Sequence, residues 1–190
     1  MHMMEEMILK YGTVLPGNVL KVGSFLNQQI DTVFLRACGR EVARLFADCG
    51  VTKVLTVEAS GIALAAAAAM EMEVPMVFAK KHKTSNVDGE IYSTTVHSYT
   101  HNTDYSIVVS RDYLSSDDVV LFVDDFLASG AALRGLQDLV HQAGAKTAGA
   151  AIAIEKSFQN GGDALRNEGL RIESLACIDS MEAEKIIFRS

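Results

Sequence analysis

Short apolar runs alternate along this chain with segments in which apolar residues recur every three or four positions. The runs predict strands buried on both faces of a sheet, and the recurring spacing predicts helices that cover the sheet. Strands are predicted at residues 51–57, 74–79, 119–123, 147–154 and 170–178, of which 119–123 is entirely apolar. Helical spacing occupies residues 4–8, 33–46, 62–72 and 130–143, with a short helix at 163–167. The alternation predicts an α/β fold with a central parallel sheet flanked by helices.

The N-terminal part carries weaker signals. Glycine and proline break the pattern at Gly12 and Pro16, and residues 19–26 then predict a short strand or an extended cover segment. Asp31 is the expected N-cap of the next helix. One side of that helix is expected to carry Val33, Phe34, Ala37, Val42, Leu45 and Phe46.

One segment departs from the alternation of strands and helices. Residues 84–89 are polar turn material, and two β-prone segments follow at 91–99 and 105–110, with a turn at 100–104. This pattern predicts a β-hairpin inserted into the α/β domain. Insertions at an active edge often serve as mobile lids, so we expect the hairpin to cover a site.

The stretch 119–133 combines three features that favour a ligand site. An apolar strand is followed by two adjacent carboxylates, Asp124 and Asp125, and small residues then lead into a helix. Ligands of open α/β sheets bind at the carboxyl ends of strands, and a helix N-terminus directs free N–H groups at an anion. The stretch therefore predicts a phosphate cup with an acidic pair beside it. The plainer alternative is a solvated strand end followed by a helix cap.

Three further groups lie near predicted strand ends. The small-residue loop Glu58, Ala59, Ser60 and Gly61 follows the first strand, where it is either a second anion site or ordinary turn chemistry. The basic cluster 80–83 begins the hairpin and is either a polyanion site or a solvated loop. Residues 155–158 place Glu155, Lys156 and an aromatic ring at the exit of another strand, where a plain surface ion pair is the alternative.

Composition excludes several classes of protein. The chain has 190 residues, a net charge of −7 and 49% apolar residues, which fits one globular domain and disfavours nucleic acid as a partner. The three cysteines are odd in number and lack CxxC spacing, so reduced thiols in a cytoplasmic protein are expected. The apolar segment 62–70 is too short to span a membrane, and residues 1–6 lack the charged-then-apolar order of a signal peptide, so neither is expected. His97 and His101 lie on strand and turn, where their spacing predicts surface histidines and no metal site.

These loops together resemble the type I phosphoribosyltransferases, and most closely their purine-salvage members. The segments that carry the resemblance are 20–31, 78–83, 124–128, 154–159 and 173–176. The resemblance implies one phosphoribosyltransferase domain over residues 1–190. Its central parallel sheet would carry the inserted hairpin as a lid and a small hood built from the N-terminal and C-terminal segments, with residues 1–30 contributing.

The resemblance also implies the reaction. The phosphoribosyl group of 5-phosphoribosyl 1-pyrophosphate (PRPP) would pass to N9 of xanthine, giving xanthosine 5′-monophosphate and pyrophosphate. Asp124 and Asp125 would accept hydrogen bonds from the ribose hydroxyls. The 5′-phosphate would bind the cup formed by Ala128, Ser129, Gly130, Ala131 and Ala132. Ala131 and Ala132 depart from the family, whose cups are richer in Gly and Thr, and the missing side-chain hydrogen bond is worth about 0.5–1.5 kcal/mol.

The same resemblance assigns residues that bind the pyrophosphate and the purine. Glu58, Ala59, Ser60 and Gly61 are expected to hold the pyrophosphate. Lys81 or Lys83 would neutralise it, with Lys81 joining the acid pair as a catalytic residue. Such lysines reach a partner subunit's site in this family, so a homodimer is expected. Leu20, Asn27 and Lys156 would contact the purine, and Phe158 would stack on it. Mg²⁺ would arrive bound to PRPP with few direct protein ligands.

Alternatives remain at this stage. Guanine, hypoxanthine or orotate in place of xanthine would leave the class unchanged, since a few contacts decide the base. A regulator that only senses PRPP would keep the same cup, although such proteins usually add a DNA-binding module. A dinucleotide-binding protein is disfavoured, because no GxGxxG follows a strand.

Overall fold

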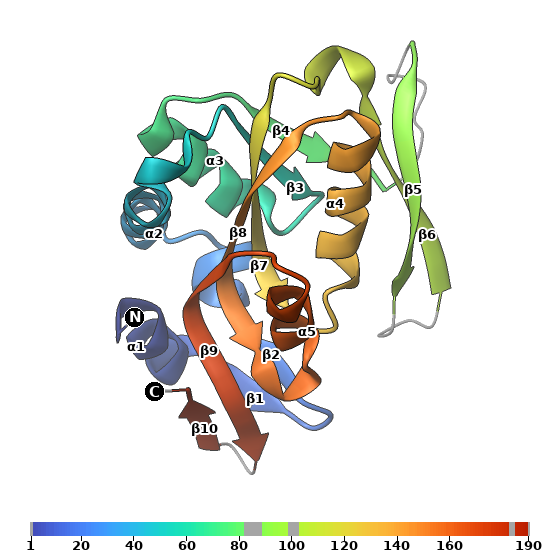
Figure 1. The fold of residues 1–190 in the computed structure, drawn as a ribbon. Helices are drawn as coiled ribbons and strands as arrows, with labels where there is room; N and C mark the ends of the chain where they lie inside the picture. Colours follow the sequence, from blue (N-terminus) through green and yellow to red (C-terminus); the bar gives the residue numbers. More distant parts are fainter. Residues whose placement is uncertain (1, 82–88, 99–102, 183–184, 190) are drawn as a thin grey trace.

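A six-stranded sheet forms the centre of the protein (Figure 1). We describe a computed structural model over residues 2–81, 89–98, 103–182 and 185–189. The strand order is β10-β9-β8-β7-β3-β4, in which only β10 runs antiparallel to its neighbour. The strands are β3 (Lys53–Val57), β4 (Met76–Ala79), β7 (Val119–Leu127), β8 (Lys146–Lys156), β9 (Ile172–Glu182) and β10 (Lys185–Phe188). The predicted α/β class with a central parallel sheet is confirmed.

Helices cover both faces of the sheet and enclose two apolar clusters (Figure 1). The helices are α1 (His2–Tyr11), α2 (Thr32–Leu45), α3 (Ile62–Met72), α4 (Ala131–Gln142) and α5 (Gly161–Asn167). One cluster lies between the sheet and α1, α2 and α3, and the other lies beneath α4. The predicted bounds of α3 agree with the structure, because its unbroken run of helix-forming alanines is easily distinguished from a strand.

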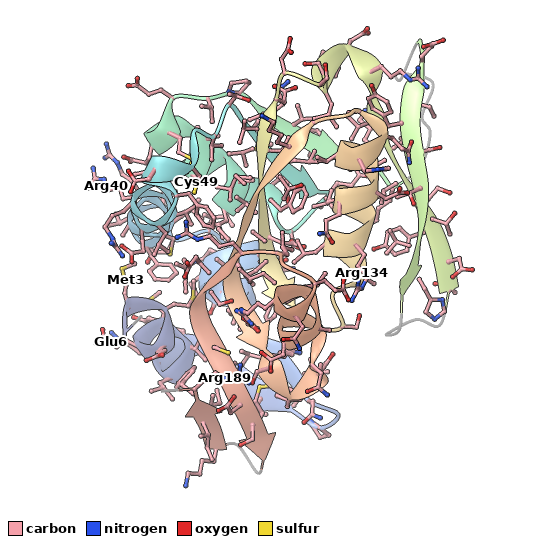
Figure 2. The ribbon with its side chains drawn as sticks, in the orientation of Figure 1. Met3, Glu6, Arg40, Cys49, Arg134 and Arg189 are labelled. Atoms are coloured by element: carbon pink, nitrogen blue, oxygen red, sulfur yellow. The ribbon has the colours of Figure 1, made fainter. Side chains whose placement is uncertain are left out.

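Close packing of α2 on α3 follows from small residues. A Cβ on Gly39 of α2 would lie 2.7 Å from the backbone of Ala67, so the two backbones approach closely only because this position is glycine. Arg40 of α2, labelled in Figure 2, lies with its Nε 3.4 Å from Glu71 Oε1 of α3. Asp31 caps α2 as predicted, but Val33 is 82% exposed, so its assignment to the buried side was wrong. It occupies the first turn, on the side of the helix that faces away from the sheet.

The inserted hairpin is confirmed as an antiparallel pair, β5 (Ile91–Ser98) and β6 (Thr103–Ser110). Its described part is anchored to α4. A Cβ on Gly135 of α4 would lie 2.5 Å from Val96 Cγ2 and 2.9 Å from Ile107 Cδ1. Val96 and Ile107 are both buried, so an apolar face of the hairpin extends the second cluster.

The N-terminal segment forms a second small sheet, β1 (Thr13–Leu15) with β2 (Val19–Lys21). The predicted strand at 19–26 is therefore correct only for its first part. The chain then makes a π-helical turn at Gly23–Asn27, which buries Phe25 and Leu26 in the first cluster. Burial of two adjacent residues on one side requires a helical turn, because a strand would direct them to opposite faces.

The C-terminal segment is held against α5 by charged groups. Arg189, labelled in Figure 2, donates to Asp163 Oδ1 of α5 at 3.0 Å and to Asp179 Oδ1 of β9 at 2.9 Å. Strand β10 precedes Arg189 and was absent from our sequence-based prediction, because four residues at a sheet edge give too short a pattern.

Candidate active site

In an open parallel sheet of this kind, ligands bind at the point where the strand order reverses. From β3 the chain crosses to β4 on one side, whereas the next sheet strand, β7, lies on the other side of β3. The ends of β3 and β7 therefore flank the reversal. The loop 58–61 follows β3, and Asp124 and Asp125 lie near the end of β7. The structure thus brings the two predicted loops to one edge of the sheet.

The acid pair lies within β7, whereas the sequence placed it after a strand ending at Val123. The cause is that the two strands beside β7 pair with it over different lengths. Pairing of β7 with β3 stops at Phe122, but pairing with β8 continues to Leu127 opposite Glu155. The two carboxylates therefore lie on a part of β7 that pairs with β8 on one side and has no pairing with β3 on the other.

Asp125 connects three segments that are distant in sequence. Its Oδ1 accepts from Ser60 Oγ at 2.8 Å, and its Oδ2 accepts from Asn27 Nδ2 at 2.9 Å. Asp124 Oδ1 accepts from the backbone N–H of Asp125 at 2.9 Å. Both carboxylates are buried, at 8% exposure for Asp124 and 5% for Asp125. The acid pair therefore links the loop after β3 with the N-terminal segment.

Ionisable groups at the acid pair have shifted pKa values. Burial, and then the neighbouring charge of Asp125, raises the pKa of Asp124 well above its ordinary value. Burial and the Asp124 carboxylate together raise the pKa of Tyr105. Lys81 Nζ lies 5.3 Å from the ring centroid of Tyr105, and its charge opposes the shift of Asp124. A buried carboxyl with a strongly shifted pKa in a crevice is typical of functional sites.

Lys81 is connected to the loop after β3, because its backbone N–H donates to Glu58 Oε1 at 2.7 Å. The peptide bond between Glu58 and Ala59 is cis. Lys83 was predicted to share the role of Lys81, and it lies outside the described residues. The structure therefore joins Glu58, Ser60, Gly61 and Lys81 around one acid pair.

The predicted cup surrounds a cavity of about 160 Å³ at the start of α4. Its wall is formed by His97, Tyr105, Asp124, Phe126, Leu127, Ala128, Ser129, Gly130, Ala131, Ala132, Leu133 and Gln159. Gly130 has φ +84, a conformation that favours glycine, and it immediately precedes α4. His97, expected to be a surface residue, lines this cavity, and His101 lies outside the described residues. Tyr105 and Gln159 were also missed, because they reach the cup from distant segments.

Gly161 supports the cup from behind and was not singled out from the sequence. A Cβ on this residue would overlap the carbonyl oxygen of Ala128 and lie 2.6 Å from the Gly130 nitrogen. Helix α5 begins at Gly161, two residues earlier than predicted. The start of α5 therefore fixes the backbone of the cup, and only glycine permits that approach.

Lys156, predicted to bind the base, contacts the N-terminal segment that carries the other predicted residues Leu20 and Asn27. Lys156 Nζ donates to the carbonyl oxygen of Asn18 at 2.9 Å and lies 5.3 Å from the ring centroid of Phe126. Burial lowers the pKa of Lys156. A cavity of about 880 Å³ is lined by Leu20 and Asn27 among other residues of this segment. Phe158 packs against the first apolar cluster, to which Leu20 belongs and which Phe126 also contacts. Phe126 was missed, because an aromatic residue in an apolar strand gives no separate signal.

Glu155 is paired with Arg166 of α5, whereas the plainer alternative from the sequence was a surface ion pair with Lys156. Arg166 donates to both carboxylate oxygens of Glu155 at 2.7 Å, and Ser174 Oγ donates to the same group. Burial alone would raise the pKa of Glu155, but these hydrogen bonds lower it below its ordinary value. A fully buried carboxylate next to Lys156 thus fixes the end of β8 to α5.

Replacing Arg166 with alanine should lower the free energy of unfolding by about 3 kcal/mol, because Glu155 would keep a buried charge without its cation. Urea denaturation measures the change. Arg44→Ala is the matched control, since Arg44 also donates to both oxygens of one carboxylate, that of Glu41, but on the surface. That variant should lose less than about 1 kcal/mol. Equal losses in the two variants would contradict the assignment.

Comparison with known proteins agrees with this geometry. Residues 29–179 match the phosphoribosyl transferase domain family, and the chain belongs to this family. Named xanthine phosphoribosyltransferases from Heliobacterium modesticaldum and Limosilactobacillus reuteri are 52% and 49% identical to it. The matches cover 99% of this chain and 100% of the first protein, and 97% of this chain and 97% of the second.

Solved structures show the same fold. The Giardia lamblia APRTase superposes with a TM-score of 0.77 at 22% identity, covering 92% of this chain and 97% of that one. The adenine phosphoribosyltransferase of Rhodothermus marinus gives 0.75 at 18% identity, covering 93% and 98%. The fold is that of the type I phosphoribosyltransferases, as predicted. None of the helices in the described ranges has the length and apolar character that crossing a membrane requires.

Proposed function

We propose that this protein transfers the phosphoribosyl group of PRPP to N9 of xanthine, giving xanthosine 5′-monophosphate and pyrophosphate in purine salvage. The observation that carries the proposal is the acid pair, which lies between the cup and the loop 58–61 at the edge of the sheet. A donor with phosphate at both ends of a ribose requires two anion sites with hydroxyl acceptors between them. Xanthine is assigned because relatives of about half identity over their full length are named for it.

The donor would bind across the crevice. Backbone N–H groups from Ala128 to Ala132, with the Ser129 hydroxyl, would hold the 5′-phosphate at the start of α4. Asp124 and Asp125 would accept from the two ribose hydroxyls. Ser60 and Asn27 donate to the two oxygens of Asp125 in the free protein, and a ribose hydroxyl would take the place of one of these donors.

Gly161→Ala tests the cup. The added Cβ would displace the backbone at Ala128, so the KM for PRPP should rise about tenfold while the KM for xanthine stays unchanged. Steady-state kinetics with each substrate varied gives both constants. Gly169→Ala is the control, because Gly169 has φ +95 but no neighbour within 4 Å of an added Cβ. It should lower stability without affecting the KM for PRPP, and a shared rise in both variants would contradict the role of Gly161.

The pyrophosphate would lie between the loop 58–61 and Lys81, whose positive charge offsets that of the leaving group. Within the described ranges no group of three or more His, Cys, Asp or Glu side chains is arranged to hold a metal ion. The nearby carboxylates of Asp124, Asp125 and Glu58 suit Mg²⁺ that keeps most of its ligands on PRPP. Mg²⁺ bound in this way would neutralise charge on the pyrophosphate. Lys83 is assigned the same role as Lys81.

The purine would lie under a hood formed by residues 1–30 and the C-terminal segment of a single domain. Lys156 would donate to the 6-oxo oxygen and Asn27 to the base edge, with Leu20 and Phe158 supplying apolar contact. No general base is required, because xanthine is acidic enough to react as its anion. The described residues would act by holding N9 in line with the ribose and excluding water from a transition state with oxocarbenium character.

The assembly is assigned as a cytoplasmic homodimer. The family resemblance supports the homodimer, because lysines at the positions of Lys81 or Lys83 reach a partner subunit's site in this family. The three cysteines are free, and burial raises the pKa of Cys38 to about 12, which makes it unreactive. Such thiols suit a reducing compartment.

Incubation with PRPP, Mg²⁺ and xanthine tests the proposal, with xanthosine 5′-monophosphate and pyrophosphate formed in equal amounts as the expected result. The change in purine absorbance follows the reaction, and Asp124→Asn/Asp125→Asn protein serves as the blank. Binding of PRPP without product from any base would favour a PRPP-sensing regulator. Faster product formation with guanine or hypoxanthine would preserve the class and change the base.

A further inference from the structure

Thr56 is the one buried hydroxyl near this site that the proposed roles leave unexplained. It lies on β3 with 0% exposure, and its Oγ1 has no hydrogen-bond partner within residues 2–81, 89–98, 103–182 and 185–189. Buried polar atoms are nearly always paired, because an unpaired one has lost its water without compensation. An exception of this kind in a native protein calls for an explanation.

Packing does not explain the hydroxyl. In β3 the side chain of Val54 shares the face of Thr56, and Leu55 and Val57 point to the opposite face. All of these are aliphatic and buried. Valine has nearly the same shape as threonine, and it would fill this position without leaving a polar atom unpaired.

The hydroxyl lies beside the acid pair. A Cβ on Gly61 would overlap Thr56 Oγ1 and lie 2.6 Å from Asp124 Oδ1, so both oxygens line the same small space against Gly61. Asp125 accepts from two side chains, whereas the hydrogen bond given to Asp124 comes from the backbone N–H of Asp125. A free donor therefore stands next to the carboxylate that has the weaker set of donors.

We propose that Thr56 is a positioning residue, whose hydroxyl donates to Asp124 when the donor substrate binds and holds this carboxylate toward the ribose. The inference rests on the proposed function, in which Asp124 accepts a ribose hydroxyl. In the free protein the hydroxyl is unpaired, and in the complex it completes the hydrogen bonds of Asp124. Thr56 thus lowers the stability of the free protein and strengthens binding of the donor.

Thr56→Val separates the two effects, because it removes the hydroxyl and keeps the shape. Its Tm should rise by about 2–4 °C, and its kcat/KM for PRPP should fall about tenfold. Thr56→Ser restores the hydroxyl and should recover most of kcat/KM. Titration calorimetry with PRPP and Mg²⁺ should show the same order of affinities. Because this binding measurement needs no turnover, it tests Thr56 even if xanthine is not the substrate.

Thr52→Val is the matched control near the opposite end of the same strand. Thr52 Oγ1 donates to Asp118 Oδ1 at 3.3 Å and accepts from the Val119 N–H at 2.9 Å. Its loss should lower the Tm and leave PRPP affinity and kcat/KM unchanged. Wild-type PRPP affinity in Thr56→Val would overturn the proposal, as would a lower Tm in that variant or a failure of Thr56→Ser to recover.

Discussion

Replacing Asp124 and Asp125 together with asparagine should lower kcat/KM by about 10²–10⁴-fold while the protein remains folded. In the complex each carboxylate, with Asp124 in its ionised form, is assigned a charge-assisted hydrogen bond from a ribose hydroxyl, worth about 1.5–3 kcal/mol. Asparagine keeps the shape and one acceptor oxygen of each side chain, so the sheet around β7 should not change. Steady-state kinetics with both substrates, together with circular dichroism of the variant, measures the outcome. Wild-type kinetics in the double variant would remove the acid pair from the site.

The single variant Asp124→Asn should change the pH dependence of stability in a defined direction. Burial raises the pKa of Asp124 in the folded state, so the folded protein keeps a proton that the unfolded chain releases above its ordinary pKa of 3.8. Wild-type stability is therefore lost as the pH rises from that value through the folded pKa. Asparagine does not ionise, so the variant should exceed the wild type in Tm at pH 7 by more than at pH 4. An equal difference at the two pH values would contradict burial of this carboxyl.

Lys156→Met should lower kcat/KM for xanthine by about 10–150-fold, because a charged donor to the 6-oxo oxygen is lost. The KM for PRPP should change by less than about twofold, since Lys156 lies beside Phe126 and Asn18, away from the cup. Steady-state kinetics with each substrate varied separates the two constants.

Lys146→Met is the control for this charge change, because Lys146 is exposed at the opposite end of the same strand, β8. It should leave both constants unchanged. An equal loss for xanthine and PRPP in Lys156→Met would show a general disturbance of the site, and unchanged kinetics would exclude Lys156 from base binding.

Local patterns were sufficient to predict most of the sheet and its helices. The strand before Asp124 is a continuous apolar run, and the strand before Glu58 is mostly valine and leucine. The alanine-rich helix 62–72 has no competing interpretation. The prediction failed where packing against other elements determines the end of a strand or the exposure of a side chain. The end of β7 depends on β8, and the exposure of Val33 depends on which side of α2 faces the sheet.

The predicted site residues came from five separate segments of the chain, and the sequence could not show how these segments meet. Asn27 and Asp125 are 98 positions apart and share a hydrogen bond, and Lys156 reaches Asn18 over 138 positions. Thr56 was not recognised, because a threonine within an apolar strand gives no sign that its hydroxyl is unpaired. That property exists only once β3, β7 and the start of α3 are assembled.

The most direct test of the account is a comparison of initial rates with PRPP and Mg²⁺ across xanthine, guanine, hypoxanthine and adenine. We predict that xanthine reacts fastest and yields xanthosine 5′-monophosphate. Xanthine as the slowest of the four bases would contradict the assigned substrate, and the absence of product from all four would contradict the assigned reaction.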